Sequence, residues 1–264
     1  MRSAARLALT CLLLAPAGAG AEERLGSSAP EREAPAARDD GRRTLRRFPV
    51  NLLRGTVGVF QGDNLAPLLV GGTVTAGASF FDDDVVDYIA DPEHAFGKSL
   101  EDGAAPEVLG LVVAGVFTTG RFVEAPRFRA MSYDLLDAFL VNGAYTSVLK
   151  VAVGRERPNG QDERSFPSGH ASNAFALAAV VERHYGWKAG IPAYALASAV
   201  GASRLQRNKH YLSDVLAGAT LGYIVGRTVV RVNGRPLGKP KGPLVSLTPV
   251  VGPRTRALLV GLSF

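Results

Sequence analysis

Apolar segments alternate with polar breaks between residues 48 and 232. Residues 64–81 carry no charge, although proline, glycine, serine and threonine dilute this stretch. Further uncharged stretches, each 12 to 15 residues long, cover residues 108–120, 138–149, 189–203 and 215–226. A membrane-spanning helix usually needs about 20 apolar residues. The pattern therefore predicts a mainly α-helical, compact bundle of buried helices, with short, tilted membrane spans as the alternative.

Local signals place three helix boundaries. Residues 130–149 form a long helical pattern, and Lys150 falls at its end. Gly169 and His210 each precede a run of helix-forming residues, so a helix is expected to begin after each of them. We expect Arg157 on a loop just beyond the first helix, because Pro158 disfavours helical backbone in the residue before it.

The N-terminal 21 residues resemble a secretory signal peptide. Arg2 and Arg6 precede a short apolar core at residues 7–14, and small residues at 19–21 suit a cleavage site. An uncleaved anchor helix is the alternative. The only cysteine, Cys11, lies in this segment, so the mature protein should have no disulfide. The prediction is an exported protein that is periplasmic or extracytoplasmic, and soluble or membrane-associated.

The remaining chain divides by composition. Residues 22–47 have few large apolar residues and predict a disordered linker whose arginine pairs are solvated or lie near anionic lipid headgroups. Residues 48–232 form the helical domain. Residues 233–264 are rich in turn residues and contain two β-prone runs, which predict a C-terminal β-hairpin. The net charge of +6 suits an anionic substrate or membrane surface without specifying either.

Three motifs lie within 65 residues, in the order K-x6-R-P, P-S-G-H and S-R-x5-H-x3-D. A phosphate group carries about two negative charges and needs donors from several directions. Two guanidinium groups, one ammonium group, a hydroxyl and the amides of a helix start could supply them. The candidate phosphate-binding residues are Lys150, Arg157, Ser168, Gly169 and Arg204.

The third motif also supplies a candidate nucleophile. Asp214 follows His210 by four residues, so its carboxylate can reach one ring nitrogen, fix the tautomer and leave the other nitrogen free to attack. His170 lies at the helix start beside Ser168 and completes the candidate catalytic set. No metal or other cofactor is expected, because side chains provide the positive charge.

In order, spacing and residue type, the motifs resemble those of the type 2 phosphatidic acid phosphatase and vanadium haloperoxidase superfamily, over roughly residues 106–230. The resemblance implies the helical fold of that family and a phosphatase with a phosphohistidine intermediate. It implies that His210 is the nucleophile and that His170 protonates the leaving oxygen and then activates water. Orthovanadate should inhibit by imitating the five-coordinate transition state.

Two other functions remain open from the sequence. The first is a vanadium-dependent haloperoxidase, in which the phosphate cradle holds vanadate. The second is a catalytically silent envelope protein whose hairpin binds a partner. The preferred prediction is a hydrolase acting on lipid-type phosphomonoesters or diphosphates, or on a small phosphoester, at a membrane surface, with no nucleic-acid partner.

Several polar residues outside the motifs have simpler interpretations. The acidic run at residues 82–84 predicts helix capping rather than a metal site, because adjacent helical residues point in different directions. His94 and His184 are expected to be structural. Arg207 and Lys209 lie beside the nucleophile and could favour diphosphates, or could simply belong to a solvated loop.

Overall fold

The structure, a computed structural model, describes residues 42–91, 98–99, 103–234, 244–252 and 255–263. The predicted signal peptide, most of the predicted linker and His94 lie outside these residues. The described helices are α1 (Phe48–Gly58), α2 (Leu65–Ala78), α3 (Asp82–Ile89), α5 (Pro106–Phe122), α6 (Pro126–Val153), α7 (Gly169–Tyr185), α8 (Trp187–Gln206) and α9 (Leu212–Gly234). Short 3-10 helices cover Leu45–Arg47, Gly62–Asn64 and Ser79–Phe81.

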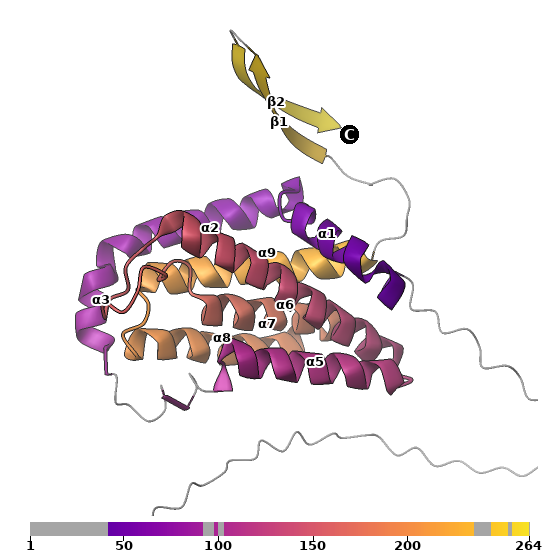
Figure 1. Cartoon of the computed structure of the whole chain (residues 1–264), viewed down its shortest axis with the longest axis horizontal. Helices are drawn as coiled ribbons and strands as arrows, with labels where there is room; N and C mark the ends of the chain where they lie inside the picture. Colours follow the sequence, from indigo (N-terminus) through magenta and orange to yellow (C-terminus); the bar gives the residue numbers. More distant parts are fainter. Residues whose placement is uncertain (1–41, 92–97, 100–102, 235–243, 253–254, 264) are drawn as a thin grey trace, which may run out of the picture. The chain divides into compact units, whose positions relative to one another are not determined.

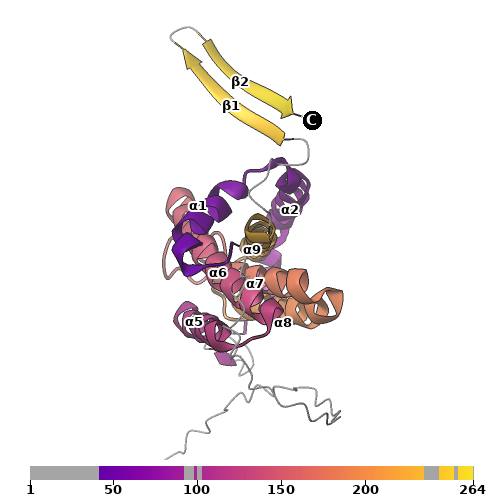
Figure 2. The same ribbon diagram turned by 90° about the vertical axis from the view of Figure 1, so that its right-hand side faces the viewer.

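Helix α7 lies between α6, α8 and α9 and packs against all three (Figures 1 and 2). Its close contact with α9 depends on glycines four residues apart. A Cβ atom on Gly222 would lie 2.1 Å from the carbonyl oxygen of Ser172, and one on Gly226 would lie 2.3 Å from that of Ala176. The two backbones therefore approach more closely than any larger side chain would permit.

The main apolar core joins α5, α6, α7 and α9. Its buried members are Val113, Met131, Leu135, Ala138, Val141, Val180, Val225 and Val229. The predicted mainly α-helical bundle is confirmed, and the expected helix boundaries near Lys150, Gly169 and His210 are present.

The prediction of buried helices is wrong for residues 64–81 and for residues 108–120, where α5 buries only Val113 and Gly120. Ala78 is the only buried residue of α2, whereas Leu68, Leu69 and Val70 are 57 to 65% exposed. Among the described residues, three helical segments are long and apolar enough to cross a membrane: Gly62–Ile89, Pro126–Val153 and Leu212–Gly234. These helical segments are longer than the uncharged runs from which they were predicted, because each one continues past the charged residue that ends its run.

The end of the predicted linker packs on the helical domain. Arg43 Nη2 donates to the fully buried Asp134 carboxylate over 2.8 Å, and Arg42 Nη1 donates to the carbonyl oxygen of Val232 over 3.3 Å. The interpretation of this arginine pair as solvated charge is therefore wrong. Burial of the carboxylate inside the bundle requires a cationic partner, and the arginine supplies it.

Strands β1 (Leu244–Gly252) and β2 (Thr255–Ser263) pair antiparallel, with Leu244 opposite Ser263. This pairing agrees with the predicted C-terminal hairpin.

Candidate active site

The three motifs occupy the helix ends at one end of the bundle. Lys150 lies in the last turn of α6, which ends where Gly154 adopts a left-handed conformation at φ 59°. Arg157 follows on the loop, as predicted. Ser168 occupies the N-cap position of α7, so the motif containing Gly169 provides the first turn of that helix. His210 lies just before α9, and Asp214 is in its first turn.

Three cations surround His210. Arg157 Nη1 lies 3.3 Å from His210 Nε2 and also donates to the carbonyl oxygen of Lys209 over 3.0 Å. Arg204 is buried near the end of α8, and Lys150 extends beside the start of α7, where a Cβ on Gly169 would lie 3.8 Å from its Cε. The predicted phosphate-binding cations therefore come together around the imidazole.

The tautomer of His210 follows from its neighbours. The guanidinium of Arg157 can only donate, so the adjacent Nε2 must act as the acceptor and the ring proton resides on Nδ1. The pKa of His210 is lowered from 6.5 to about 4, first by burial and then by the charges of Lys150, Arg157 and Arg204, against the opposing effect of Asp214. The imidazole is consequently neutral at pH 7, with the lone pair of Nε2 facing the cations.

Asp214 faces the other ring nitrogen but is held mainly by other donors. His210 Nδ1 lies 3.7 Å from Asp214 Oδ2, which is a close electrostatic contact but longer than a hydrogen bond. The same oxygen accepts from Ser165 Oγ over 2.5 Å and from the amide of Tyr211 over 2.9 Å. The Asp214 carboxylate therefore faces His210 as predicted, but no direct hydrogen bond joins the two side chains.

Ser168 offers the site a buried hydroxyl. The residue is fully buried, and among the described residues its Oγ has no hydrogen-bond partner. Its amide donates to the carbonyl oxygen of Asp214 over 3.0 Å, which ties the start of α7 to the start of α9. His170 is half-buried in the first turn of α7, two residues beyond Ser168. A buried hydroxyl without a partner at a helix start is suited to bind an anion.

A second set of residues, which the sequence motifs did not predict, lies behind Asp214. Arg155 Nη1 donates to Asp214 Oδ1 over 2.9 Å, and its Nη2 donates to Asp82 Oδ2 over 2.8 Å. Asp82 also accepts from the amide and the hydroxyl of Ser213, over 2.9 and 2.5 Å. Arg155 lies at a variable position of the first motif, so its position in the sequence does not indicate this role.

The prediction that Asp82 caps a helix is wrong for its side chain, which binds the loop and α9 instead. Asp83 and Asp84 are exposed in the first turn of α3. Within the part of the chain that the structure describes, no three His, Cys, Asp or Glu residues are grouped to hold a metal ion. Lys209 Nζ donates to Gln161 Oε1 over 2.5 Å on the loop beside the site.

The comparison with protein families identifies the central part of the chain. Residues 133–236 match the model of the PAP2 superfamily. The chain therefore contains a PAP2 superfamily domain. This is the family that the motifs resemble, and its match includes every predicted site residue while leaving Asp82 outside.

Two curated relatives are similar over part of the chain. The chain is 40% identical over 87 residues to a lipid A 1-phosphatase of Porphyromonas gingivalis, covering 32% of this chain and 20% of the relative. It is 35% identical over 86 residues to a lipid A 4'-phosphatase of Helicobacter pylori, covering 31% of this chain and 43% of the relative. The chain thus aligns with less than half the length of either relative.

A solved structure is similar over most of the bundle. The transmembrane PAP2-type phosphatidylglycerolphosphate phosphatase from Bacillus subtilis superposes with a TM-score of 0.53 at 20% sequence identity. The match covers 65% of this chain and 96% of that one. At this identity, the similarity establishes the shared fold.

Proposed function

We propose that the protein is a metal-independent phosphatase that removes phosphate from lipid-type phosphomonoesters or diphosphates through a phosphohistidine. The observation that carries this proposal is a neutral, buried His210 whose Nε2 faces the Arg157 guanidinium. The unpartnered hydroxyl of Ser168 adds to it, because the Ser168 amide is bonded to the carbonyl oxygen of Asp214. A dianionic phosphoryl group would be stabilised there by side chains, and the imidazole lone pair would point at its phosphorus.

The reaction proceeds in two displacements. In the first, His210 Nε2 attacks phosphorus, the bond from phosphorus to the ester oxygen breaks, and His170 gives that oxygen its proton. In the second, water attacks the phosphohistidine, His170 takes the water proton, and the bond from nitrogen to phosphorus breaks. The products are inorganic phosphate and either the alcohol, from a phosphomonoester, or the monophosphate, from a diphosphate. Asp214 stabilises the positive charge that develops on the ring through its proximity to Nδ1.

The membrane is the proposed location of the substrate. Apolar side chains are exposed on several helices, including Phe80 at 84%, Leu111 at 76% and Val151 at 77%. A surface of this kind marks contact with lipid or another apolar partner. The curated relatives are named as lipid A phosphatases, which supports a phosphorylated lipid as the substrate class. The signal-like residues 1–21 support export, with the active site on the extracytoplasmic side.

Phosphate release by the detergent-purified full chain tests the activity. The panel contains isoprenyl diphosphates, phosphatidate, phosphatidylglycerol phosphate, a lipid A phosphate and soluble esters, each with and without excess chelator. We expect lipid phosphates to be hydrolysed, chelator to have no effect and orthovanadate to inhibit. Loss of activity in EDTA that magnesium or zinc restores would contradict the mechanism.

Carbonate extraction and cysteine labelling test the location. We expect the chain to stay in the membrane after alkaline carbonate, because three helices could span it. Glu163 is exposed on the loop next to the site, so a Glu163→Cys variant in a Cys11→Ser background should react with a membrane-impermeant maleimide in intact cells. Labelling only after lysis would place the site on the cytoplasmic side and overturn the proposed export.

A further inference from the structure

We propose that a cavity beside the active site binds a hydrocarbon chain of the substrate, an inference that rests on the proposed function. The cavity has a volume of about 420 Å³ and lies between α2, α6, α9 and the loop that carries the first two motifs. Pockets of this size are typical of small-ligand sites. Its lining residues are Val59, Leu68, Gly71, Gly72, Thr75, Ala76, Ser79, Leu149, Arg155, Phe166, Pro167, Ser213, Ala217, Thr220, Leu221 and Ile224.

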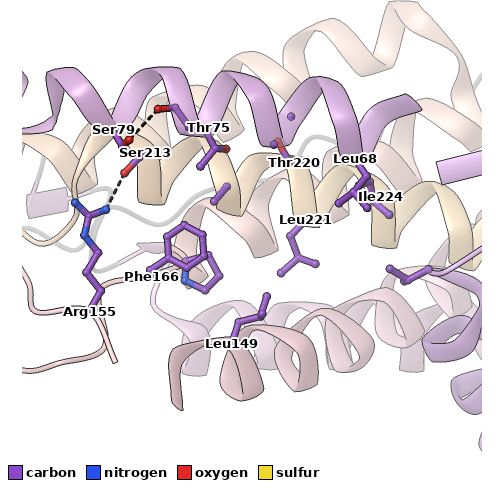
Figure 3. A pocket seen from close by; sticks show the side chains of 16 residues that line it. Leu68, Thr75, Ser79, Leu149, Arg155, Phe166, Ser213, Thr220, Leu221 and Ile224 are labelled. Atoms are coloured by element: carbon purple, nitrogen blue, oxygen red, sulfur yellow. Dashed lines mark hydrogen bonds between the residues drawn. The ribbon is translucent and has the colours of Figure 1, made fainter. Parts of the chain in front are cut away.

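The cavity is long and has one polar end. Figure 3 shows Arg155 and Ser213 at one end and Leu68 and Ile224 at the other, with Leu221 between them. Along α9 the lining extends from Ser213 to Ile224, a rise of about 16 Å. Arg155 is the single charged residue in the lining. Such an arrangement suits an aliphatic chain whose polar group lies at the Arg155 end.

The polar end is continuous with the active site. Phe166 and Pro167 line the cavity and directly precede Ser168, while Ser213 directly precedes Asp214. Arg155 lines the cavity and donates to Asp214 Oδ1 over 2.9 Å. Three of the cavity walls come from the segments that are long and apolar enough to span a membrane. A lipid whose phosphate reaches His210 could therefore place a chain in this cavity while remaining among its membrane neighbours.

Two glycines of α2 provide a matched test. Gly72 lines the cavity, and a Cβ there would have no atom within 4 Å, so a larger side chain would extend into open space. Gly77 lies on the same helix, also with nothing within 4 Å of a Cβ, but does not line the cavity. Gly72→Leu should obstruct the cavity without disturbing helix packing, and Gly77→Leu controls for the added leucine.

The assay compares a long-chain phosphatidate with nitrophenyl phosphate. We expect Gly72→Leu to lower kcat/KM for phosphatidate about tenfold or more while leaving that for nitrophenyl phosphate within about twofold. Gly77→Leu should change neither. An unchanged phosphatidate rate, or an equal loss on both substrates, would overturn the cavity assignment. If the wild-type chain hydrolysed no phosphoester at all, the proposed function itself would fail.

Photo-crosslinking of the wild-type chain gives a second measurement that needs no variant. A long-chain lipid phosphate with a diazirine in the middle of the chain should crosslink to residues 68–76 or 217–224. Crosslinks confined to other parts of the chain would overturn the proposal.

A separate observation, the contacts of Asp82, leads us to propose that Asp82 and Arg155 are positioning residues for Asp214. Asp82 is 4% exposed and binds both Arg155 and Ser213, so it fixes the start of α9 to the loop after α6. The Arg155 guanidinium also stacks 4.0 Å from the centre of the Tyr211 ring. These contacts occupy Asp214 Oδ1 and direct Oδ2 toward His210.

Variants of the acidic run test this role. We expect Asp82→Asn to lower kcat about 10- to 100-fold with little change in KM, and the exposed neighbour variant Asp83→Asn to behave as wild type. Arg155→Met removes a positive charge beside Asp214, so protonation of His210 becomes easier and the acid limb of kcat/KM should move to higher pH. Arg155→Lys should restore the wild-type limb.

If Asp82 and Arg155 were merely structural, their variants would contain less active enzyme, but the acid limb of the kcat/KM profile would stay at the same pH. The proposal is therefore overturned if Asp82→Asn matches Asp83→Asn in kcat, or if Arg155→Met leaves the acid limb in place.

Discussion

A buried carboxylate meets an imidazole and an arginine at both ends of the helical bundle, but the two groups differ in what they leave unbound. At the far end, Asp134 accepts from Arg43 Nε and Nη2, His184 Nε2 and Asn233 Nδ2 over 2.8 to 3.0 Å. The active-site end lies about 24 Å away along α6, measured from Asp134 to Lys150. Asp214 is similarly enclosed there, but Arg157 lies 3.3 Å from the second nitrogen of His210, and the buried hydroxyl of Ser168 has no partner among the described residues.

The residues that adjoin the two carboxylates include different buried atoms without partners in the described part of the chain. Beside Asp134 they include Asp137 Oδ1 and Asn233 Oδ1, which are acceptors and would repel an anion. At the active-site end they include Ser168 Oγ, which can donate. A similar inventory of residues thus makes a structural clamp in one place and a candidate anion site in the other. His184 is structural, as predicted, because it donates to a carboxylate that Arg43 and Asn233 also hold.

The largest expected effect separates the two histidines. His210→Ala should lower turnover by at least about 10⁴-fold and abolish covalent labelling by substrate phosphate, because the nucleophile is lost. His184→Ala should retain labelling and kcat while unfolding at a lower temperature. Acid-labile, base-stable phosphate trapped on His210→Ala would refute the assignment of the nucleophile.

Leaving-group dependence distinguishes the role of His170. We expect His170→Ala to lose about 10² to 10⁴ in rate with alkyl esters, whose leaving oxygen needs a proton, and much less with nitrophenyl phosphate. Rates measured across a series of leaving groups check this. Equal losses on both substrate types would mean that His170 is not the general acid.

Breaking the far-end clamp should affect stability rather than chemistry. Asp134→Ala leaves the buried Arg43 charge without its carboxylate, so we expect a loss of about 3–5 kcal/mol in the free energy of unfolding. Thermal unfolding in detergent measures it, with the exposed Asp87→Ala as control. The folded Asp134→Ala enzyme should keep kcat within about twofold. A selective loss of turnover would show that the two ends are coupled.

Removing the Ser168 hydroxyl should affect catalysis rather than stability, the opposite of what is expected for Asp134→Ala. Ser168→Ala removes no hydrogen bond from the described structure, so unfolding should change little. Loss of a donor to an anionic transition state should reduce kcat/KM about 10- to 100-fold and weaken vanadate inhibition in parallel. Unchanged inhibition by vanadate would remove Ser168 from the phosphate cradle.

The smallest effect is a pH dependence set by His210. Its pKa is lowered from 6.5 to about 4 on folding, so the unfolded chain gains a proton below pH 6.5 that the folded chain does not accept until about pH 4. The contribution of His210 to the free energy of unfolding therefore has its full value above pH 6.5. As the pH is lowered from 6.5 to about 4, this contribution falls by up to about 1.4 kcal/mol per pH unit. Comparing wild type with His210→Gln by thermal unfolding isolates this slope, which should be absent in the variant.

The same shift sets the acid limb of activity. Nε2 must be unprotonated to attack, so protonation of His210 should begin to lower kcat/KM only near pH 4. A limb near 6.5 would indicate an imidazole that is exposed to water in the working enzyme.

The local sequence was sufficient to predict the helix boundaries at the site, because these depend on residues that are neighbours in the chain. Helix starts at Gly169 and Leu212 and a helix end at Gly154 follow from the conformational preferences of glycine, serine and proline. These boundaries place the three motifs at helix ends, where amides and charged side chains are available to a phosphate. The apolar pattern predicted the helical fold class, and the resemblance of the motifs predicted the family.

Tertiary structure decided everything that depends on residues far apart in the chain. Asp82 reaches Ser213 across 131 positions, and Arg43 reaches Asp134 across 91, so no local pattern distinguishes these charges from solvated ones. The exposed apolar face of α2 and the long cavity beneath it likewise result from how helices pack, because an apolar sequence does not specify which neighbour covers it. Burial of charge is a property of the whole fold, which is why only the packed bundle reveals which carboxylates hold the structure together and which face the chemistry.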